Sequence, residues 1–257
     1  MTHFRYLKGM LLGQYLLLFL TVIIGGASAF YLRRQNQSNL QLALSFSGAY
    51  LLGISVLHLM PTVFAGGEES VGLWVLLGFF IQLFLEQLSG GVEHGHLHVH
   101  DKASTGFAVQ VMLGLCLHAF IEGMPLANYE DFHQALPGHE HHSEHLLIGI
   151  ILHKVPAAFA LVLLLLFSNY RERLVWFCLV LFAFMSPLGA ALVHLVAGGE
   201  PLSPQIMHIL LAIVVGSFLH IATTILFEVD SSHRHRIPWK RLLAIVVGIS
   251  GALLTLL

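Results

Sequence analysis

Eight apolar stretches, each close to 20 residues long, follow one another along the chain with only short polar connections between them. A helix needs about 20 consecutive apolar residues to cross the hydrocarbon core of a bilayer. Charged residues make up 10% of the 257 residues, whereas soluble domains average about 25%. We therefore predict an all-α, polytopic membrane protein with one membrane domain over residues 1–257. The predicted spans cover residues 10–32, 39–64, 72–92, 105–127, 146–168, 173–197, 205–228 and 239–257.

Basic residues gather in alternate connections, and this pattern predicts how the chain sits in the membrane. Arg33 and Arg34 follow the first span, and Arg171 and Arg173 lie at the connection after the fifth. The connections after the second, fourth and sixth spans contain acidic residues but no lysine or arginine. Because lysine and arginine favour the cytoplasmic side, both termini are predicted to be extracytoplasmic. The short connections favour a plasma membrane of the bacterial inner-membrane type.

Two motifs place ionisable side chains inside the apolar stretches. HAFIEGMP puts His118 and Glu122 four residues apart, on one face of a helix, and HKVP puts His153 and Lys154 on the next span. An ionisable group near mid-bilayer costs roughly 2.5–3.5 kcal/mol on insertion scales, so such groups are usually functional. Imidazole and carboxylate groups are typical ligands of divalent transition metals. We therefore predict an intramembrane metal site formed by His118, Glu122 and His153.

Prolines follow both motifs. Pro125 lies three residues after Glu122, and Pro156 lies three residues after His153. Proline removes a backbone donor from the helix, and broken helices at matching depth mark the binding sites of many transporters. The two prolines therefore predict interruptions of both spans beside the metal site.

Four further polar residues are candidates for a secondary or gating role. Lys154 either pairs with Glu122 or takes the position of a second cation. His58 lies near the outer end of its span and is a candidate ligand for metal uptake, while Glu86 is either solvated near the cytoplasmic boundary or involved in metal exit. Ser186 is a helix hydrogen-bonding group or a weak ligand. Isolated membrane histidines are expected to hydrogen-bond between helices, as predicted for His194, His208 and His220.

Histidine is unusually abundant, with 18 residues against 12 lysines and arginines combined. Residues 93–101 form a histidine-rich tract on the predicted cytoplasmic side, and residues 133–145 form another on the outer side. Such tracts are either solvated loops or weak metal-binding segments. We predict that they handle metal, because they flank a buried site of the same chemistry.

The motifs resemble those of the ZIP (Zrt/Irt-like) family of divalent metal transporters. HAFIEG matches the H-x-x-x-E-G signature of that family, and the HK pair at residues 153–154 is similar to the subgroup of plasma-membrane zinc importers. Further matches are HLMP, FFIQLFLEQ, MSPLG and GSFLHI. The resemblance covers essentially the whole chain and implies eight spans, with the first three and last three forming inverted repeats around spans 4 and 5.

The resemblance also implies a function. Members of the family carry zinc, and often iron or manganese, into the cytoplasm by an elevator-like movement, and many are dimers. The implied cargo is Zn²⁺, with Fe²⁺, Mn²⁺, Co²⁺ and Cd²⁺ as alternatives, and no cofactor is implied. Carried over by position, His118, Glu122 and His153 match the primary metal ligands. Besides metal ions, the expected partners are the lipid bilayer and a second copy of the chain. The net charge of −2 indicates no nucleic-acid partner.

Departures from the family pattern indicate one metal site rather than two. Two-metal members place polar or acidic residues at four positions that are Ala119, Lys154, Ala157 and Ser186 in this chain. The remaining site has three protein ligands, so water or a fourth side chain must complete it. Weak coordination suits transport, because an ion has to leave as well as bind.

Two other functions fit a buried histidine–carboxylate site. An intramembrane zinc hydrolase would also use histidines, an acidic base and an open coordination position. The chain lacks the HExxH motif of many zinc hydrolases. A metal-sensing receptor would bind the ion without moving it across the membrane. Transport remains the favoured prediction.

Overall fold

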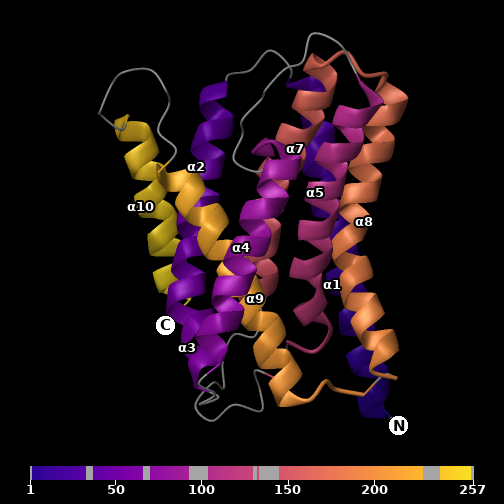
Figure 1. Cartoon of the computed structure of the whole chain (residues 1–257), viewed down its shortest axis with the longest axis vertical. Helices are drawn as coiled ribbons and strands as arrows, with labels where there is room; N and C mark the ends of the chain where they lie inside the picture. Colours follow the sequence, from indigo (N-terminus) through magenta and orange to yellow (C-terminus); the bar gives the residue numbers. More distant parts are fainter. Residues whose placement is uncertain are drawn as a thin grey trace.

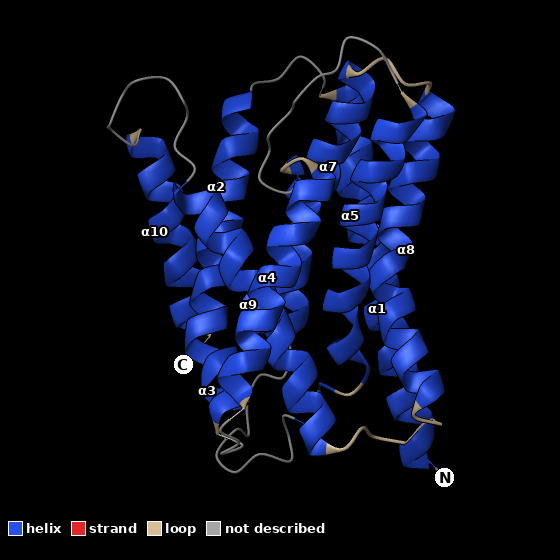
Figure 2. Ribbon diagram, in the orientation of Figure 1, coloured by secondary structure: helices blue, strands red, loops and turns tan. Residues whose placement is uncertain are grey.

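The protein is an all-helical bundle whose long helices run roughly alongside one another (Figures 1 and 2). The structure is a computed structural model, and it describes residues 2–32, 37–65, 70–92, 104–129, 132, 145–198, 200–227 and 238–255. No strand occurs within these ranges, which confirms the predicted all-α class. The helices are α1 (Thr2–Tyr31), α2 (Gln37–Ile54), the π-helical turn η1 (Ser55–Leu59), α3 (Met60–Phe64), α4 (Val71–Ser89), α5 (Thr105–Gly123), the 3₁₀ turn η3 (Met124–Ala127), α7 (His145–Phe167), α8 (Glu172–Val196), α9 (Pro204–Phe227) and α10 (Trp239–Leu254).

Seven of the described helical segments are long and apolar enough to cross a membrane. They coincide with the first seven predicted spans, because α2, η1 and α3 continue one another as a single segment over Asn39–Phe64. The eighth predicted span corresponds to α10, which is described over 16 residues. The chain is therefore a polytopic membrane protein, while the 3+2+3 inverted-repeat relationship stays a prediction.

The helices pack in two groups. The first bundle contains α2, α4, α9 and α10, and the second bundle contains α1, α5, α7 and α8. In Figure 1 the first bundle lies toward the left and the second toward the right. The bundles meet where α5 packs on α4 and where α7 packs on α2. Because α7 also contacts α1 and α8, it is the most buried of the spanning helices.

Glycines allow the closest helix approaches within each bundle. A side chain at Gly78 of α4 would fall on the Ile213 carbonyl of α9, and one at Gly216 of α9 would fall on the Val75 carbonyl of α4. In the second bundle, Gly123 of α5 stands against the α8 backbone in the same way. Small residues let membrane helices pack backbone to backbone, which strengthens van der Waals contact where the hydrophobic effect contributes little.

The two prolines behave differently. The α-helix of α5 ends at Gly123 and the 3₁₀ turn η3, which contains Pro125, follows it, so the predicted interruption of that span is confirmed. By contrast, α7 continues as an α-helix through Pro156, and the predicted break there is wrong. Pro156 is buried, and α7 is packed by α1, α2 and α8. Packing by neighbouring helices can hold a proline-containing span in helical form.

Candidate metal centre

His118 and Glu122 are in direct contact deep inside the second bundle. They lie one turn apart on α5, and His118 Nε2 is 2.7 Å from Glu122 Oε2. The side chains are 2% and 1% exposed, so both are removed from lipid and water. The predicted pairing on one helix face is therefore present. Two ligands of a tetrahedral zinc ion stand about 3.3 Å apart when each bond is about 2.0 Å. His118 Nε2 and Glu122 Oε2 would therefore have to move only slightly further apart to admit an ion.

His153 approaches the same pair from α7. Its ring meets the His118 ring edge-on, with centroids 5.9 Å apart and an interplanar angle of 86°. The structure thus brings the three predicted ligands into one buried cluster. Within the described ranges, no three histidine, cysteine, aspartate or glutamate side chains form a ready-made metal cage. Metal binding would therefore require the contacts among these side chains to rearrange.

Lys154 belongs to the same cluster. Its Nζ atom lies 3.6 Å from Glu122 Oε1 and 4.7 Å from the centroid of the Phe182 ring on α8. The side chain is only 2% exposed. An aromatic face attracts a cation through its quadrupole, so the ammonium group is stabilised by Glu122 and by the ring. Of the two predicted roles for Lys154, the structure contains the ion pair with Glu122.

A second layer of polar groups reaches the cluster from the first bundle. Ser217 of α9 donates its hydroxyl proton to Gln82 Oε1 of α4, with the oxygens 3.0 Å apart. The Ser217 oxygen also lies 3.4 Å from His118 Nδ1. A serine has one hydroxyl proton, so its oxygen is left to accept from the Nδ1–H of His118. Nε2, which shares a proton with Glu122 across 2.7 Å, is then the nitrogen from which an arriving metal ion would displace that proton.

Gln82 and Ser217 were not among the predicted site residues. A signal was present, because each is a polar residue within an apolar stretch, in FFIQLFLEQ and GSFLHI. Nothing in the sequence indicates, however, that these residues face His118 rather than other helices. Their relationship to the site depends on how the two bundles dock.

Ser186 is engaged in helix packing. Its hydroxyl on α8 donates to the Ala119 carbonyl of α5 at 2.7 Å. This bond spans the close contact at which Gly123 stands against the backbone of Ser186. The structure therefore agrees with the prediction of a helix hydrogen-bonding group rather than a ligand.

Glu86 is bonded to another helix rather than simply solvated. Its carboxylate on α4 bonds with the ring Nε2 of His220 on α9, and the side chains are 14% and 7% exposed. The prediction that His220 bonds between helices is confirmed. His208 differs, because its Nδ1 bonds to the Pro204 carbonyl of its own helix. The Glu86–His220 pair lies about one turn beyond Gln82 and Ser217 along both helices.

His58 lies on the π-helical turn η1, at the opposite side of the centre. Its ring stacks on that of His145, with centroids 4.1 Å apart, and its Nε2 atom is 2.8 Å from Thr255 Oγ1. π-Helical turns often occur at functional sites. Burial also raises the pKa of the Tyr129 hydroxyl, just after the turn η3, and this hydroxyl therefore stays protonated. His145 is the end of the predicted outer tract, whose other residues, like the tract 93–101, lie outside the described residues.

Seven spanning segments around a buried imidazole–carboxylate–ammonium cluster define an integral membrane protein with an ionic site inside its helix bundle. The sequence model of the ZIP zinc transporter family matches residues 93–257, which is more than half of the chain. The chain belongs to this family, whose members are named as zinc transporters and not as enzymes. The resemblance seen in the sequence motifs is thereby confirmed, whereas the HK subgroup stays a prediction.

Curated relatives carry consistent names. Human zinc transporter ZIP1 is 27% identical over 266 residues, a match that covers 85% of this chain and 78% of the human protein. Mouse zinc transporter ZIP1 is 27% identical over 294 residues, covering 93% of this chain and 87% of the mouse protein. Zinc transporter ZIP9-B of Xenopus laevis is 29% identical over 178 residues, covering 65% and 55%. None of these names indicates a hydrolase.

Proposed function

We propose that this protein carries Zn²⁺ into the cytoplasm through one intramembrane site formed by His118, Glu122 and His153. The observation that carries the proposal is the burial of these side chains together between α5 and α7, with His118 and Glu122 already in contact at 2.7 Å. Two imidazoles and a carboxylate suit zinc, and also Fe²⁺, Mn²⁺, Co²⁺ and Cd²⁺. The names of the relatives favour zinc as the physiological cargo.

Lys154 makes the site reversible in this proposal. An arriving ion replaces the proton-mediated His118–Glu122 contact and competes with the ammonium for Glu122, which lies 3.6 Å from Nζ. When the ion leaves, Lys154 returns to the carboxylate and spares it an uncompensated buried charge, which would be costly. While the ion is bound, three protein ligands and water hold it loosely enough for release.

The division into two bundles supports the proposed alternating access. All three proposed ligands belong to the second bundle, while Gln82 and Ser217 contact His118 from the first. Sliding of the bundles against each other would expose the site first to one side and then to the other. His58 with His145 lies toward the proposed uptake side, and Glu86 with His220 lies toward the proposed release side.

The proposed orientation puts both termini outside the cytoplasm, because in the sequence the basic residues gather in the connections after the first, third, fifth and seventh spans. The proposed location is a plasma membrane of the bacterial inner-membrane type, and the proposed assembly is a homodimer. In Figure 1 both termini lie toward the same end of the bundle, as this orientation requires.

The test is metal uptake into proteoliposomes that are offered Zn²⁺, Fe²⁺, Mn²⁺ and Cd²⁺ together. Wild type should accumulate zinc, and His118→Ala, Glu122→Ala and His153→Ala should each lose uptake while still reconstituting. His194→Ala is the matched control, because His194 is also a histidine within a spanning helix but lies in the last turn of α8, outside the cluster. Uptake that survives in His118→Ala and Glu122→Ala would disprove the site.

The same preparation separates transport from the alternatives. A folded wild type that binds zinc but moves none would favour a sensor, and one that holds zinc without exchange while hydrolysing lipid or peptide would favour a hydrolase. Rapid exchange together with net accumulation supports the transporter.

A further inference from the structure

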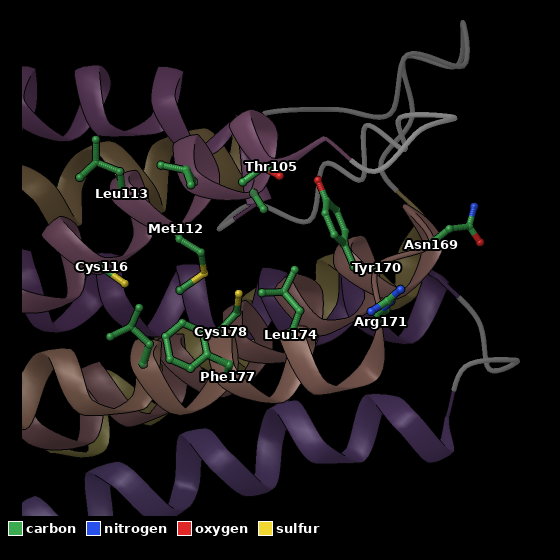
Figure 3. A pocket seen from close by; sticks show the side chains of 13 residues that line it. Thr105, Met112, Leu113, Cys116, Asn169, Tyr170, Arg171, Leu174, Phe177 and Cys178 are labelled. Carbon is green, nitrogen blue, oxygen red and sulfur yellow. The ribbon is translucent and has the colours of Figure 1, made fainter.

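A cavity of about 660 Å³ lies between α5 and α8, on the side of the second bundle where both helices begin. Figure 3 shows its lining side chains, with the polar ones gathered at one end and the apolar ones at the other. Met112, Cys116, Phe177 and Leu181 belong to the apolar part. The volume lies within the range of about 300–1,000 Å³ that is typical of ligand-binding pockets. This cavity is separate from the buried His118 cluster.

Hydrogen bonds join the two helix starts that form the mouth of the cavity. Ser104 caps α5 by accepting a hydrogen bond from the Phe107 backbone N–H at 3.1 Å. The Tyr170 hydroxyl, from the connection between α7 and α8, donates to the Ser104 carbonyl at 2.5 Å. The start of α8 is thereby tied to the start of α5. Both helices run from the mouth into the membrane, so their N-termini share it.

The described lining of the mouth contains a basic side chain. Among the described residues, Arg171 provides the one charged side chain of the lining, and it is exposed at the N-cap of α8. Glu172 and Arg173 follow it in sequence but do not line the cavity. Helix N-termini carry partial positive charge and exposed backbone N–H groups. The guanidinium and the two helix starts therefore favour an anion at this end.

The other end of the cavity opens toward the bilayer. Val109 and Leu113 of α5 and Phe177 of α8 line it, and their side chains are 60%, 50% and 63% exposed in the isolated protein. In a membrane these surfaces meet acyl chains. A soluble anion would leave this apolar part unused, whereas a phospholipid has both a charged head and long apolar chains.

We propose that this cavity binds an anionic phospholipid from the leaflet at the α5 and α8 N-termini. The phosphate lies at Arg171 and the two helix starts, and one acyl chain runs along Met112 toward Cys116. Zwitterionic lipids fit the apolar part equally but carry no net negative charge for the mouth. Anionic lipids are attracted to basic residues near the membrane surface, so the charge of the headgroup sets the preference.

The cavity lies beside the helix that carries two of the proposed metal ligands. This link to transport rests on the proposed function, whereas the lipid site itself does not. Cys116 lies two residues before His118 on α5, and α8 packs against α5 through the Ser186–Ala119 bond. A lipid between α5 and α8 would therefore touch the helix that carries two proposed metal ligands. Lipid binding itself does not depend on metal, so it is measured without metal.

The test is native mass spectrometry of the full chain in detergent, titrated with phosphatidylglycerol and with phosphatidylcholine of the same acyl chains. Wild type should prefer phosphatidylglycerol. Arg171→Gln should weaken phosphatidylglycerol binding about fivefold, the effect of one basic residue near an anionic surface, and leave phosphatidylcholine binding unchanged. Arg173→Gln is the matched control and should behave as wild type. Val109→Trp, at an exposed lining position, should weaken binding of both lipids.

Several results would overturn the proposal. They are equal binding of the two lipids by wild type, equal losses in Arg171→Gln and Arg173→Gln, or unchanged binding in Val109→Trp. Displacement of phosphatidylglycerol by inorganic phosphate would indicate a soluble-anion site instead. His118→Ala should bind lipid as wild type does, so a failure of the lipid site and a failure of the proposed metal site are distinguishable.

Discussion

The Ser217 hydroxyl oxygen lies 3.4 Å from His118 Nδ1, and this contact joins the two helix bundles at the candidate metal centre. His118 belongs to α5 of the second bundle, while Ser217 belongs to α9 of the first and also donates to Gln82 of α4. The contact orients the imidazole so that Nε2 faces Glu122. Because it crosses the boundary between the bundles, it has to break if they slide past each other. Metal binding and bundle movement would then act on the same side chain.

Loss of this contact should weaken metal binding. In Ser217→Ala the Nδ1–H of His118 loses its partner and the ring is free to change tautomer. Groups that orient a metal ligand contribute about 10–100-fold to affinity, so we expect KM for zinc uptake to rise about tenfold with the protein still in the membrane. Ser47→Ala is the control, because the buried Ser47 hydroxyl bonds only to a carbonyl of its own helix. Equal KM values in the two variants would contradict the role of Ser217.

Lys154 should stabilise the protein when metal is absent. Lys154→Met keeps much of the side-chain volume but removes the charge beside Glu122. Breaking one side of a buried ion pair costs about 3–5 kcal/mol, and His118 remains in contact with Glu122 to offset part of it. We expect a lower Tm than wild type without metal, and a larger rise of Tm on adding zinc, because the ion replaces the missing charge.

Thermal unfolding of the detergent-solubilised protein, with and without zinc, tests this expectation. Leu165→Met is the matched control, since Leu165 is buried on the same helix and the change conserves volume. Kinetics give a second measure: zinc should bind more tightly to Lys154→Met and leave more slowly, lowering both KM and kcat. An identical response to zinc in wild type and Lys154→Met would mean that the ammonium does not compete with the ion.

Local rules account for most of what the sequence alone could predict. The spans follow from apolar length, because the bilayer sets the length of a helix that crosses it. The His118–Glu122 contact follows from the helical repeat, since residues four apart share a face. Pro125 ends its helix as the proline rule predicts. Each of these features depends on residues close together in the chain.

Features that depend on docking between distant helices could not be predicted. Ser217 is 99 residues from His118 and 135 from Gln82 in the sequence. Their contact is set by the rotation of three helices about their axes, which an apolar stretch does not specify. For the same reason, the sequence could not decide whether Lys154 pairs with Glu122 or takes the position of a second cation. At Pro156 the local rule was wrong, because packing on several sides of α7 preserves the helix.

The Glu86–His220 pair should hold α4 on α9. Hydrogen bonds to charged groups contribute about 1.5–3 kcal/mol, so Glu86→Ala and His220→Ala should each lower the free energy of unfolding. The double variant should be little less stable than either single one, because one interaction is lost in all three. A double-mutant cycle measured by thermal unfolding gives the coupling energy. Additive losses would show that the two side chains act independently.

Close packing of α5 on α8 should depend on Gly123. A methyl group there would overlap the Ser186 backbone carbonyl, and overpacking of a tight interface costs about 1–3 kcal/mol. Gly123→Ala should therefore lower Tm and, because Glu122 is the preceding residue, also reduce zinc uptake. Gly106→Ala is the matched control on the same helix: its added methyl meets open space, and alanine in place of glycine favours a helix by up to about 1 kcal/mol. A Tm for Gly123→Ala equal to or above that of wild type would contradict this prediction. It would show that the close contact of α5 with α8 at Gly123 does not stabilise the candidate metal centre.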